Sequence, residues 1–241
     1  AGCLVVHLNC GIAALVFAYL LGPRNSKKQL IPHSPPLVMI GTCMLWIGWF
    51  GFNGGSALAA NGSAGMAIIV THISAAVSAL IWMTIEWIKY GKPTLVGTAT
   101  GCIAGLATIT PASGFVGPIG ALVIGVLAAL VCYNMVGFVK STLKIDDTLD
   151  VFAVHGVGGL LGTLLLAPLG SKTFGGLGLS DLSIFEQLKI QIIGSLAVLF
   201  WSGIVSVIIL LFLKKFIGIR VSDEEEEAGL DLTSHSESAY N

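Results

Sequence analysis

Apolar runs of about 20 residues recur along most of this 241-residue chain, and each is long enough to cross a bilayer as a helix. Only 10% of the residues are charged and 55% are hydrophobic, whereas about 25% of the residues in an ordinary soluble domain are charged. The sequence therefore predicts an all-α polytopic membrane protein. We expect seven spans, at residues 1–22, 37–59, 65–89, 95–110, 116–139, 150–169 and 187–213.

The distribution of Lys and Arg predicts how these spans are oriented. Ten of the twelve basic residues lie in the loops after spans one, three, five and seven, and the positive-inside rule makes that side cytoplasmic. We expect residues 1–219 to form the transmembrane domain and residues 220–241 to form an acidic, solvated cytoplasmic tail. The ten residues are Arg24, Lys27, Lys28, Lys89, Lys92, Lys140, Lys144, Lys214, Lys215 and Arg220.

Two histidines interrupt the apolar runs, His7 in the first span and His155 in the sixth. Ionisable groups inside membrane-length apolar segments are rare and are functional-site candidates. The two spans are antiparallel, and Gly11 and Gly159 follow the histidines at the same spacing. Repeats with an odd number of spans insert with opposite topology, which predicts an inverted five-helix repeat. This chain would hold the last helix of the first repeat, the full second repeat and a long final helix, within a longer protein of about 400 residues.

A buried histidine pair suits a particular kind of solute. We expect both rings to be neutral in a low-dielectric site, with one ring donating a hydrogen bond to the other and the outer nitrogens free. Such a lining would accept a small polar neutral solute, or one that loses its charge on entry. The alternative is that each histidine is a lone buried group, hydrogen-bonded to a neighbouring helix.

Other side chains near the histidines support further hypotheses. Cys3, His7 and Cys10 share one helix face, which would suit a soft metal. Cysteine is also a common small core residue and no fourth ligand is suggested, so we expect no metal and no cofactor. Asp147 and Asp150 lie at the start of span six, where they would cap the helix or orient the histidine on it.

Span two carries aromatic and polar side chains at membrane depth. Trp49, Phe52 and Ser56 fall at i, i+3 and i+7, on one helix face. An aromatic ring and a hydroxyl near the outer mouth would hold a small cation through a cation–π contact and a hydrogen bond. Packing, or an aromatic belt at the membrane interface, would give the same pattern. His72 in span three is a further pore candidate, for which we favour a packing role.

Several blocks of the sequence resemble the ammonium transporter family (Amt/Mep/Rh). The opening AGCLVVHLNCGIAALVFAYLLGPR is similar to the family's signature around its first pore histidine, and the resemblance covers essentially all 241 residues. The letters WFGFN point to the Amt branch. Cys10 is a mild departure, because Ala, Gly or Ser is more usual at that position. Further blocks follow in the expected order: WIGWFGFNGGS, TPASGF, DDTLDVFAVHGVGG and GLDLTSHSESAY.

The resemblance implies a homotrimer in the plasma membrane, with one pore in each subunit. His7 and His155 would be the twin pore histidines, and Trp49 would line the pore wall. Phe52 would be one of two stacked phenylalanines that gate the pore from outside, and Ser56 would belong to the outer ammonium site. The tail would couple the subunits, and in prokaryotic members a PII-type signalling protein docks near it.

Ammonium transport is therefore the expected function, by capture of ammonium, deprotonation and passage of ammonia. A bare cation in an apolar pore would lose roughly tens of kcal/mol of hydration, whereas ammonia avoids most of this cost and potassium cannot lose its charge. The alternatives are an ammonium sensor with little flux, and a fragment that does not conduct alone. A retinal protein is excluded, because span seven has no lysine between Lys189 and Lys214. We expect neither enzymatic activity nor a nucleic-acid partner.

Overall fold

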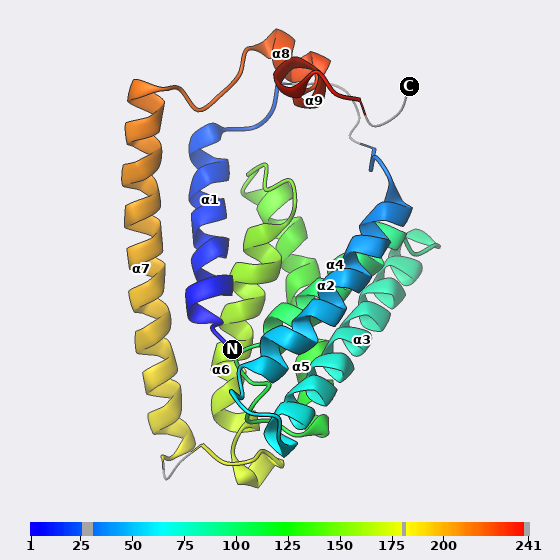
Figure 1. Cartoon of the computed structure of the whole chain (residues 1–241), viewed down its shortest axis with the longest axis vertical. Helices are drawn as coiled ribbons and strands as arrows, with labels where there is room; N and C mark the ends of the chain where they lie inside the picture. The colour runs from blue at the N-terminus through cyan, green and yellow to red at the C-terminus, as the bar shows by residue number, and fades with distance from the viewer. Residues whose placement is uncertain (26–30, 180–181, 239–241) are drawn as a thin grey trace.

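The computed structural model describes residues 1–25, 31–179 and 182–238, and its regular elements within these ranges are helices, with no strand (Figure 1). Lys27 and Lys28, counted above among the basic residues, lie outside the described residues. The elements are η1 (Leu4–Leu8), α1 (Asn9–Leu21), α2 (Pro35–Gly55), α3 (Gly62–Tyr90), α4 (Leu95–Ile109), α5 (Pro118–Gly137), η2 (Phe138–Thr142), η3 (Phe152–Val157), α6 (Gly158–Leu169), η4 (Lys172–Phe174), α7 (Ile184–Phe216), α8 (Asp223–Ala228) and α9 (Leu230–His235).

Within the described residues, six helices are long and apolar enough to cross a membrane. Three of them include a π-helical stretch: η1 continues into α1, α5 into η2, and η3 into α6. The helix α4 has 15 residues, so it is about 22 Å long and shorter than a typical hydrocarbon core of about 30 Å. The all-α polytopic fold is confirmed, and the seven predicted spans correspond to six full-length helices and the short apolar helix α4.

Some helices begin earlier than hydropathy predicts, because their capping residues lie outside the apolar runs. The helix α7 begins at Ile184 rather than at residue 187. Ser183 Oγ accepts a hydrogen bond from the Glu186 amide (3.2 Å), and the Glu186 carboxylate accepts one from the Ser183 amide (2.9 Å). This capping box satisfies backbone groups at the helix start. The helix α2 begins at Pro35, since proline fits the first turn of a helix.

The helices α3, α4 and α5 pack closely through small residues. Ser74 Oγ donates a hydrogen bond to the Gly105 carbonyl (2.9 Å), and a Cβ added at Gly105 would lie 2.5 Å from the Ser74 carbonyl oxygen. A glycine is therefore needed where α3 meets α4. The adjoining core consists of Val70, Ile109, Ala112, Val116, Ala121, Ile124 and Leu166.

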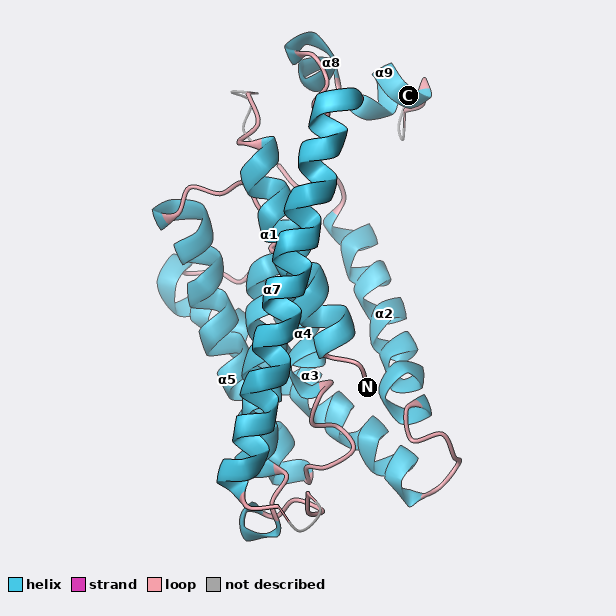
Figure 2. Ribbon diagram, turned by 90° about the vertical axis from the view of Figure 1, so that its left-hand side faces the viewer, coloured by secondary structure: helices cyan, strands magenta, loops and turns pink. Residues whose placement is uncertain are grey.

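The long helix α7 lies beside α1 at one edge of the bundle (Figures 1 and 2). Ser202 Oγ donates a hydrogen bond to the Asn9 carbonyl (2.9 Å), which joins the two helices. Large exposed apolar surfaces are unusual on soluble proteins, and on α7 they indicate contact with lipid. Its exposed residues include Phe185, Ile193, Phe200, Trp201, Ile208 and Phe212.

The chain after α7 forms two short helices, α8 and α9, at the end of the bundle where α1 ends (Figure 1). Arg220 donates hydrogen bonds to the Leu21 carbonyl (3.0 Å) and to the Glu226 carboxylate (2.7 Å). The Asn25 amide also donates to Glu226 (2.6 Å). The tail is therefore largely exposed to solvent but attached to the end of α1 by polar contacts.

Candidate functional site

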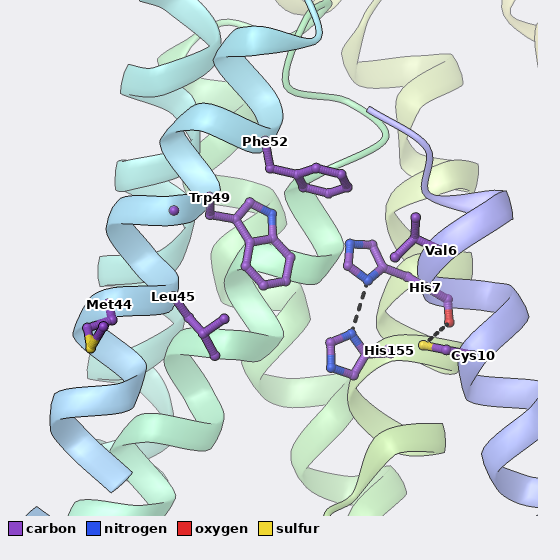
Figure 3. A pocket seen from close by; sticks show the side chains of 9 residues that line it. Val6, His7, Cys10, Met44, Leu45, Trp49, Phe52 and His155 are labelled. Carbon is purple, nitrogen blue, oxygen red and sulfur yellow. Dashed lines mark hydrogen bonds between the residues drawn. The ribbon is translucent and has the colours of Figure 1, made fainter. Parts of the chain in front are cut away.

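The structure brings His7 and His155 together, although they lie on separate helices (Figure 3). Their Nδ1 atoms are 3.0 Å apart and their ring centroids 5.1 Å apart. One Nδ1 donates its proton to the other, so two neutral rings can make this contact. Each histidine lies on a π-helical stretch, a geometry that is frequent at functional sites. His7 is 2% exposed, and its Nε2 has no hydrogen-bond partner within the described residues.

The histidine pair lines a partly open cavity of about 480 Å³ between η1, α1, α2 and η3, in which Met44 and Leu45 are exposed. Apart from the two imidazoles and one thiol, its side chains are aliphatic or aromatic. Burying a charge against such walls is costly, whereas a small neutral solute needs only a few hydrogen bonds. The other lining residues are Val6, Cys10, Met44, Leu45, Gly48, Trp49 and Phe52 (Figure 3).

Two aromatic side chains of α2 pack on His7. The indole of Trp49 stacks on the imidazole, with centroids 5.3 Å apart and planes at 8°, and the Phe52 ring meets it edge-on at 6.1 Å. Trp49 Nε1 donates a hydrogen bond to Thr110 Oγ1 (2.8 Å), at the buried end of α4. The apolar and polar pattern does not indicate Thr110 as a site residue; the available signal is its position before a proline at a helix end.

Ser56 and His72 do not line this cavity. Ser56 is the exposed C-terminal cap of α2, one turn beyond Phe52, and its hydroxyl donates to the Phe52 carbonyl (2.7 Å). His72 is exposed on α3, where its ring centroid lies 5.2 Å from that of Trp46. The side of α2 that carries Phe52 therefore reaches the histidines, while the Ser56 hydroxyl lies beyond the cavity.

The two aspartates lie at the start of the helix that carries the second histidine. The Asp147 carboxylate is 5% exposed and accepts hydrogen bonds from the amides of Val151 (3.0 Å) and Phe152 (2.8 Å). These contacts satisfy amides that have no partner within the helix. Asp150 forms an ion pair with Lys140 (2.7 Å). Neither carboxylate lines the cavity. Asp147 contacts residues at the helix start, and Asp150 contacts a lysine of η2.

A third aspartate joins the two histidine helices at the same end of the bundle. Arg24 donates to both oxygens of Asp146 through its Nε and one terminal nitrogen, each at 2.6 Å. The hydrogen bond from Arg24 is the main cause that lowers the pKa of Asp146 to about 2. This pair links the end of α1 to the loop before η3. In the sequence, Arg24 indicates only the orientation of the first span, and nothing there predicts its contact with Asp146.

The cysteines near the histidines have separate partners. Cys3 Sγ donates to the Gly159 carbonyl (3.2 Å) and accepts a hydrogen bond from Thr163 (3.4 Å), whereas Cys10 Sγ donates to the His7 carbonyl (3.3 Å). In the part of the chain that the structure describes, no group of three or more His, Cys, Asp and Glu residues is arranged to hold a metal ion.

Comparison with known sequences relates the chain to one family. Residues 1–240 match the family model described as Ammonium Transporter Family. An ammonium transporter of Aquifex aeolicus is 48% identical over 241 residues, which are 100% of this chain and 56% of that protein. Ammonium transporter Amt1 of Archaeoglobus fulgidus is 45% identical over 242 residues, covering 100% of this chain and 61% of that protein. The chain thus spans less than two thirds of the length of these curated relatives.

Solved structures show the same relationship. A structure described as "Sensor Amt Protein" has a TM-score of 0.87 and 36% identity, covering 95% of this chain and 58% of that chain. The crystal structure of Candida albicans Mep2 has a TM-score of 0.82 and 36% identity, covering 93% of this chain and 52% of that chain. These matches confirm the expected fold class.

Proposed function

Because this chain belongs to the ammonium transporter family, we propose that it forms part of a pore that captures ammonium, removes a proton and passes ammonia. The observation that carries the proposal is the pair of hydrogen-bonded histidines on the wall of an otherwise apolar cavity. The relatives named above are transporters, so the chain is assigned no enzymatic role.

Selectivity follows from the cost of moving a charge into this cavity. An ammonium ion would have to exchange water for apolar walls, at an idealised cost of roughly tens of kcal/mol. Ammonia crosses without that cost, and the free Nε2 of His7 offers it a hydrogen-bonding partner. Potassium has no proton to lose, so it remains charged and is rejected.

Three residues of α2 receive roles along the path. Trp49 forms the wall against which His7 is held, and Phe52 closes the cavity from the outer side. Ser56 lies one turn further out, where its exposed hydroxyl is available to an ammonium ion at the outer site. These positions follow the order in which the residues occur along α2.

The aspartates receive an indirect role. Asp147 holds the first amides of the second histidine helix, and Asp150 pairs with Lys140 beside it. We assign them to the orientation of that helix. The division into a transmembrane domain at 1–219 and a tail at 220–241 is retained as a proposal; α7 ends at Phe216.

Assembly and location are proposed on the basis of the family. We propose a homotrimer in the plasma membrane, with the C-terminus cytoplasmic because the loops on that side carry most of the basic residues. A PII-type signalling protein is the proposed partner at that face. Membrane lipid would contact the exposed apolar side of α7.

A second candidate function is ammonium sensing with little flux. It is favoured by one observation, the TM-score of 0.87 to a structure described as "Sensor Amt Protein". A sensor would bind ammonium at the same residues and pass on a conformational signal, so binding and transport have to be measured on the same preparation.

The test compares His155→Ala with the unchanged protein in proteoliposomes, made from the complete reading frame that encodes this chain. An ammonium pulse with an internal pH indicator reports ammonia entry, and a potassium indicator reports leakage. We expect His155→Ala to lose selective transport or to pass potassium, because the cavity loses half of the hydrogen-bonded pair. His72→Ala is the matched control, since His72 lies outside the cavity.

Unchanged rate and selectivity in His155→Ala would rule out the twin-histidine mechanism. If the unchanged protein binds ammonium in a calorimeter but carries none across the membrane, the sensing function replaces transport.

A further inference from the structure

The helices that carry the two histidines cross at glycines. A Cβ added at Gly11 would lie 2.3 Å from the Cα of Gly156 and 2.4 Å from its nitrogen, next in the chain to His155. Both are backbone atoms, which cannot rotate away as a side chain can. Nonbonded carbon atoms at optimal separation are about 3.5–4.0 Å apart. The crossing in this form therefore requires glycine at position 11.

The second helix repeats the arrangement. Gly159 follows His155 by four residues, as Gly11 follows His7. A Cβ added at Gly159 would lie 2.9 Å from the Cβ of His7 and 3.0 Å from Cys3 Sγ. Gly11 thus faces the backbone of Gly156, next to His155, and Gly159 faces the Cβ atom of His7.

We propose that Gly11 and Gly159 are positioning residues that set the separation of the two histidine rings. Small residues allow two helices in lipid to approach closely, and here the close approach lies within one turn of the imidazole contact. An effect of these glycines on ion selectivity rests on the proposed function, whereas their effect on the hydrogen bond between the two histidines does not.

The expected displacement is large compared with the tolerance of a hydrogen bond. A methyl group at position 11 would push the helices apart by about 1 Å, because contacting carbons need about 3.5 Å. The Nδ1 atoms are now 3.0 Å apart, and hydrogen bonds of this kind extend to about 3.2 Å. The rings would lose their mutual hydrogen bond, and water would enter between them.

The experiment measures that hydrogen bond directly. Histidine labelled with ¹⁵N in the protein in lipid bilayers gives a scalar coupling between the two Nδ1 atoms by solid-state NMR. We expect the coupling in the unchanged protein and its loss in Gly11→Ala and Gly159→Ala. The matched control is Gly41→Ala in α2, where an added Cβ meets no atom within 4 Å; it should keep the coupling. Potassium leakage relative to ammonium transport should rise in the first two variants only.

A rescue variant separates positioning from general destabilisation. The two atoms nearest to a Cβ at Gly159 belong to side chains, and the nearest backbone atom, the Leu8 nitrogen, lies at 3.6 Å, so Gly159→Ala is informative even if Gly11→Ala does not fold. Adding Cys3→Ala to Gly159→Ala removes the Sγ that lies 3.0 Å from the new methyl. We expect the double variant to regain part of the coupling, which a helix weakened for other reasons would not do.

Coupling that persists in both single glycine variants overturns the inference, whatever their transport. Coupling lost equally in Gly41→Ala also overturns it, because the effect would then not depend on the crossing. If the unchanged protein carries no ammonium but the coupling is lost only in the crossing variants, the positioning role stands and the proposed function fails.

Discussion

The orientation of Trp49 depends on one buried hydroxyl from another helix. Its Nε1 donates to Thr110 Oγ1 (2.8 Å), and Thr110 donates its own proton to the Leu106 carbonyl (2.8 Å). Thr110 is 0% exposed, so water cannot replace it as an acceptor. The stacking of the indole on His7 is therefore coupled to a residue that does not line the cavity.

Replacing Thr110 by Val should destabilise the protein by about 1–3 kcal/mol, because a buried N–H is left without an acceptor. Denaturant unfolding in detergent measures this difference. Thr84→Val is the matched control: Thr84 is exposed on α3 and donates only to the Leu80 carbonyl (2.7 Å), and such surface changes stay within about 0.5 kcal/mol. Equal stability of the two variants would contradict the assigned contact.

At the scale of the helices, an ion pair between Arg24 and Asp146 joins the end of α1 to the loop before η3. Arg24 and Asp146 have side chains 26% and 24% exposed and make two hydrogen bonds of 2.6 Å. Because both helices carry a histidine, this pair limits how far their ends can separate. The close contacts at Gly11 and Gly159 limit their separation near the histidines.

The Arg24–Asp146 contact predicts a pH-dependent stability. The pKa of Asp146 is lowered from 3.8 to about 2, mainly by the hydrogen bond from Arg24. A lowered pKa means that the folded state favours the carboxylate. The contact with Arg24 therefore stabilises the folded state above pH 4, and this stabilisation is lost as pH falls through about 2. Because the pair is partly exposed, solvent screening limits its contribution to the free energy of unfolding to about 1 kcal/mol.

Asp146→Asn should therefore be less stable than the unchanged protein at pH 6, and the difference should shrink as pH falls from 4 towards 2. Unfolding measured at several pH values in one detergent checks this. Glu224→Gln, an exposed change in the tail, serves as the control. A difference that is the same at pH 6 and near pH 2 would show that the carboxylate charge is not involved.

At the scale of the whole molecule, α7 presents an exposed apolar surface, which we expect lipid to cover. Trp201 lies near the middle of this 33-residue helix and is 72% exposed. Substituting Asp at this position should reduce membrane insertion by about 2.5–3.5 kcal/mol, because a charge at the centre of a spanning helix is costly. The fraction of protein that resists carbonate extraction from membranes measures insertion.

Trp201→Phe is the control for this substitution, since it keeps an apolar ring and should insert normally. If Trp201→Asp inserts as well as the control, the exposed face of α7 contacts protein or water rather than lipid.

The membrane fold and the two histidines could be recognised from the sequence. The apolar runs and the interruptions at His7 and His155 are properties of short stretches, so they are visible without any tertiary information. Helix ends were less predictable. The start of α7 depends on a hydrogen-bonded pair, Ser183 and Glu186, that hydropathy does not register.

Contacts between helices were decided only by the tertiary structure. The histidine contact joins residues 148 positions apart, and the bond from Trp49 to Thr110 joins residues 61 positions apart. Ser56, at the C-terminal cap of α2, lies beyond the cavity that Trp49 of the same helix lines. A local pattern determines which face of a helix is apolar, but the distance between two faces depends on where glycines permit close approach. For this reason the sequence could indicate the candidate residues and the hydrogen bond expected between the two histidines, while the bond from Trp49 to Thr110 required the packed bundle.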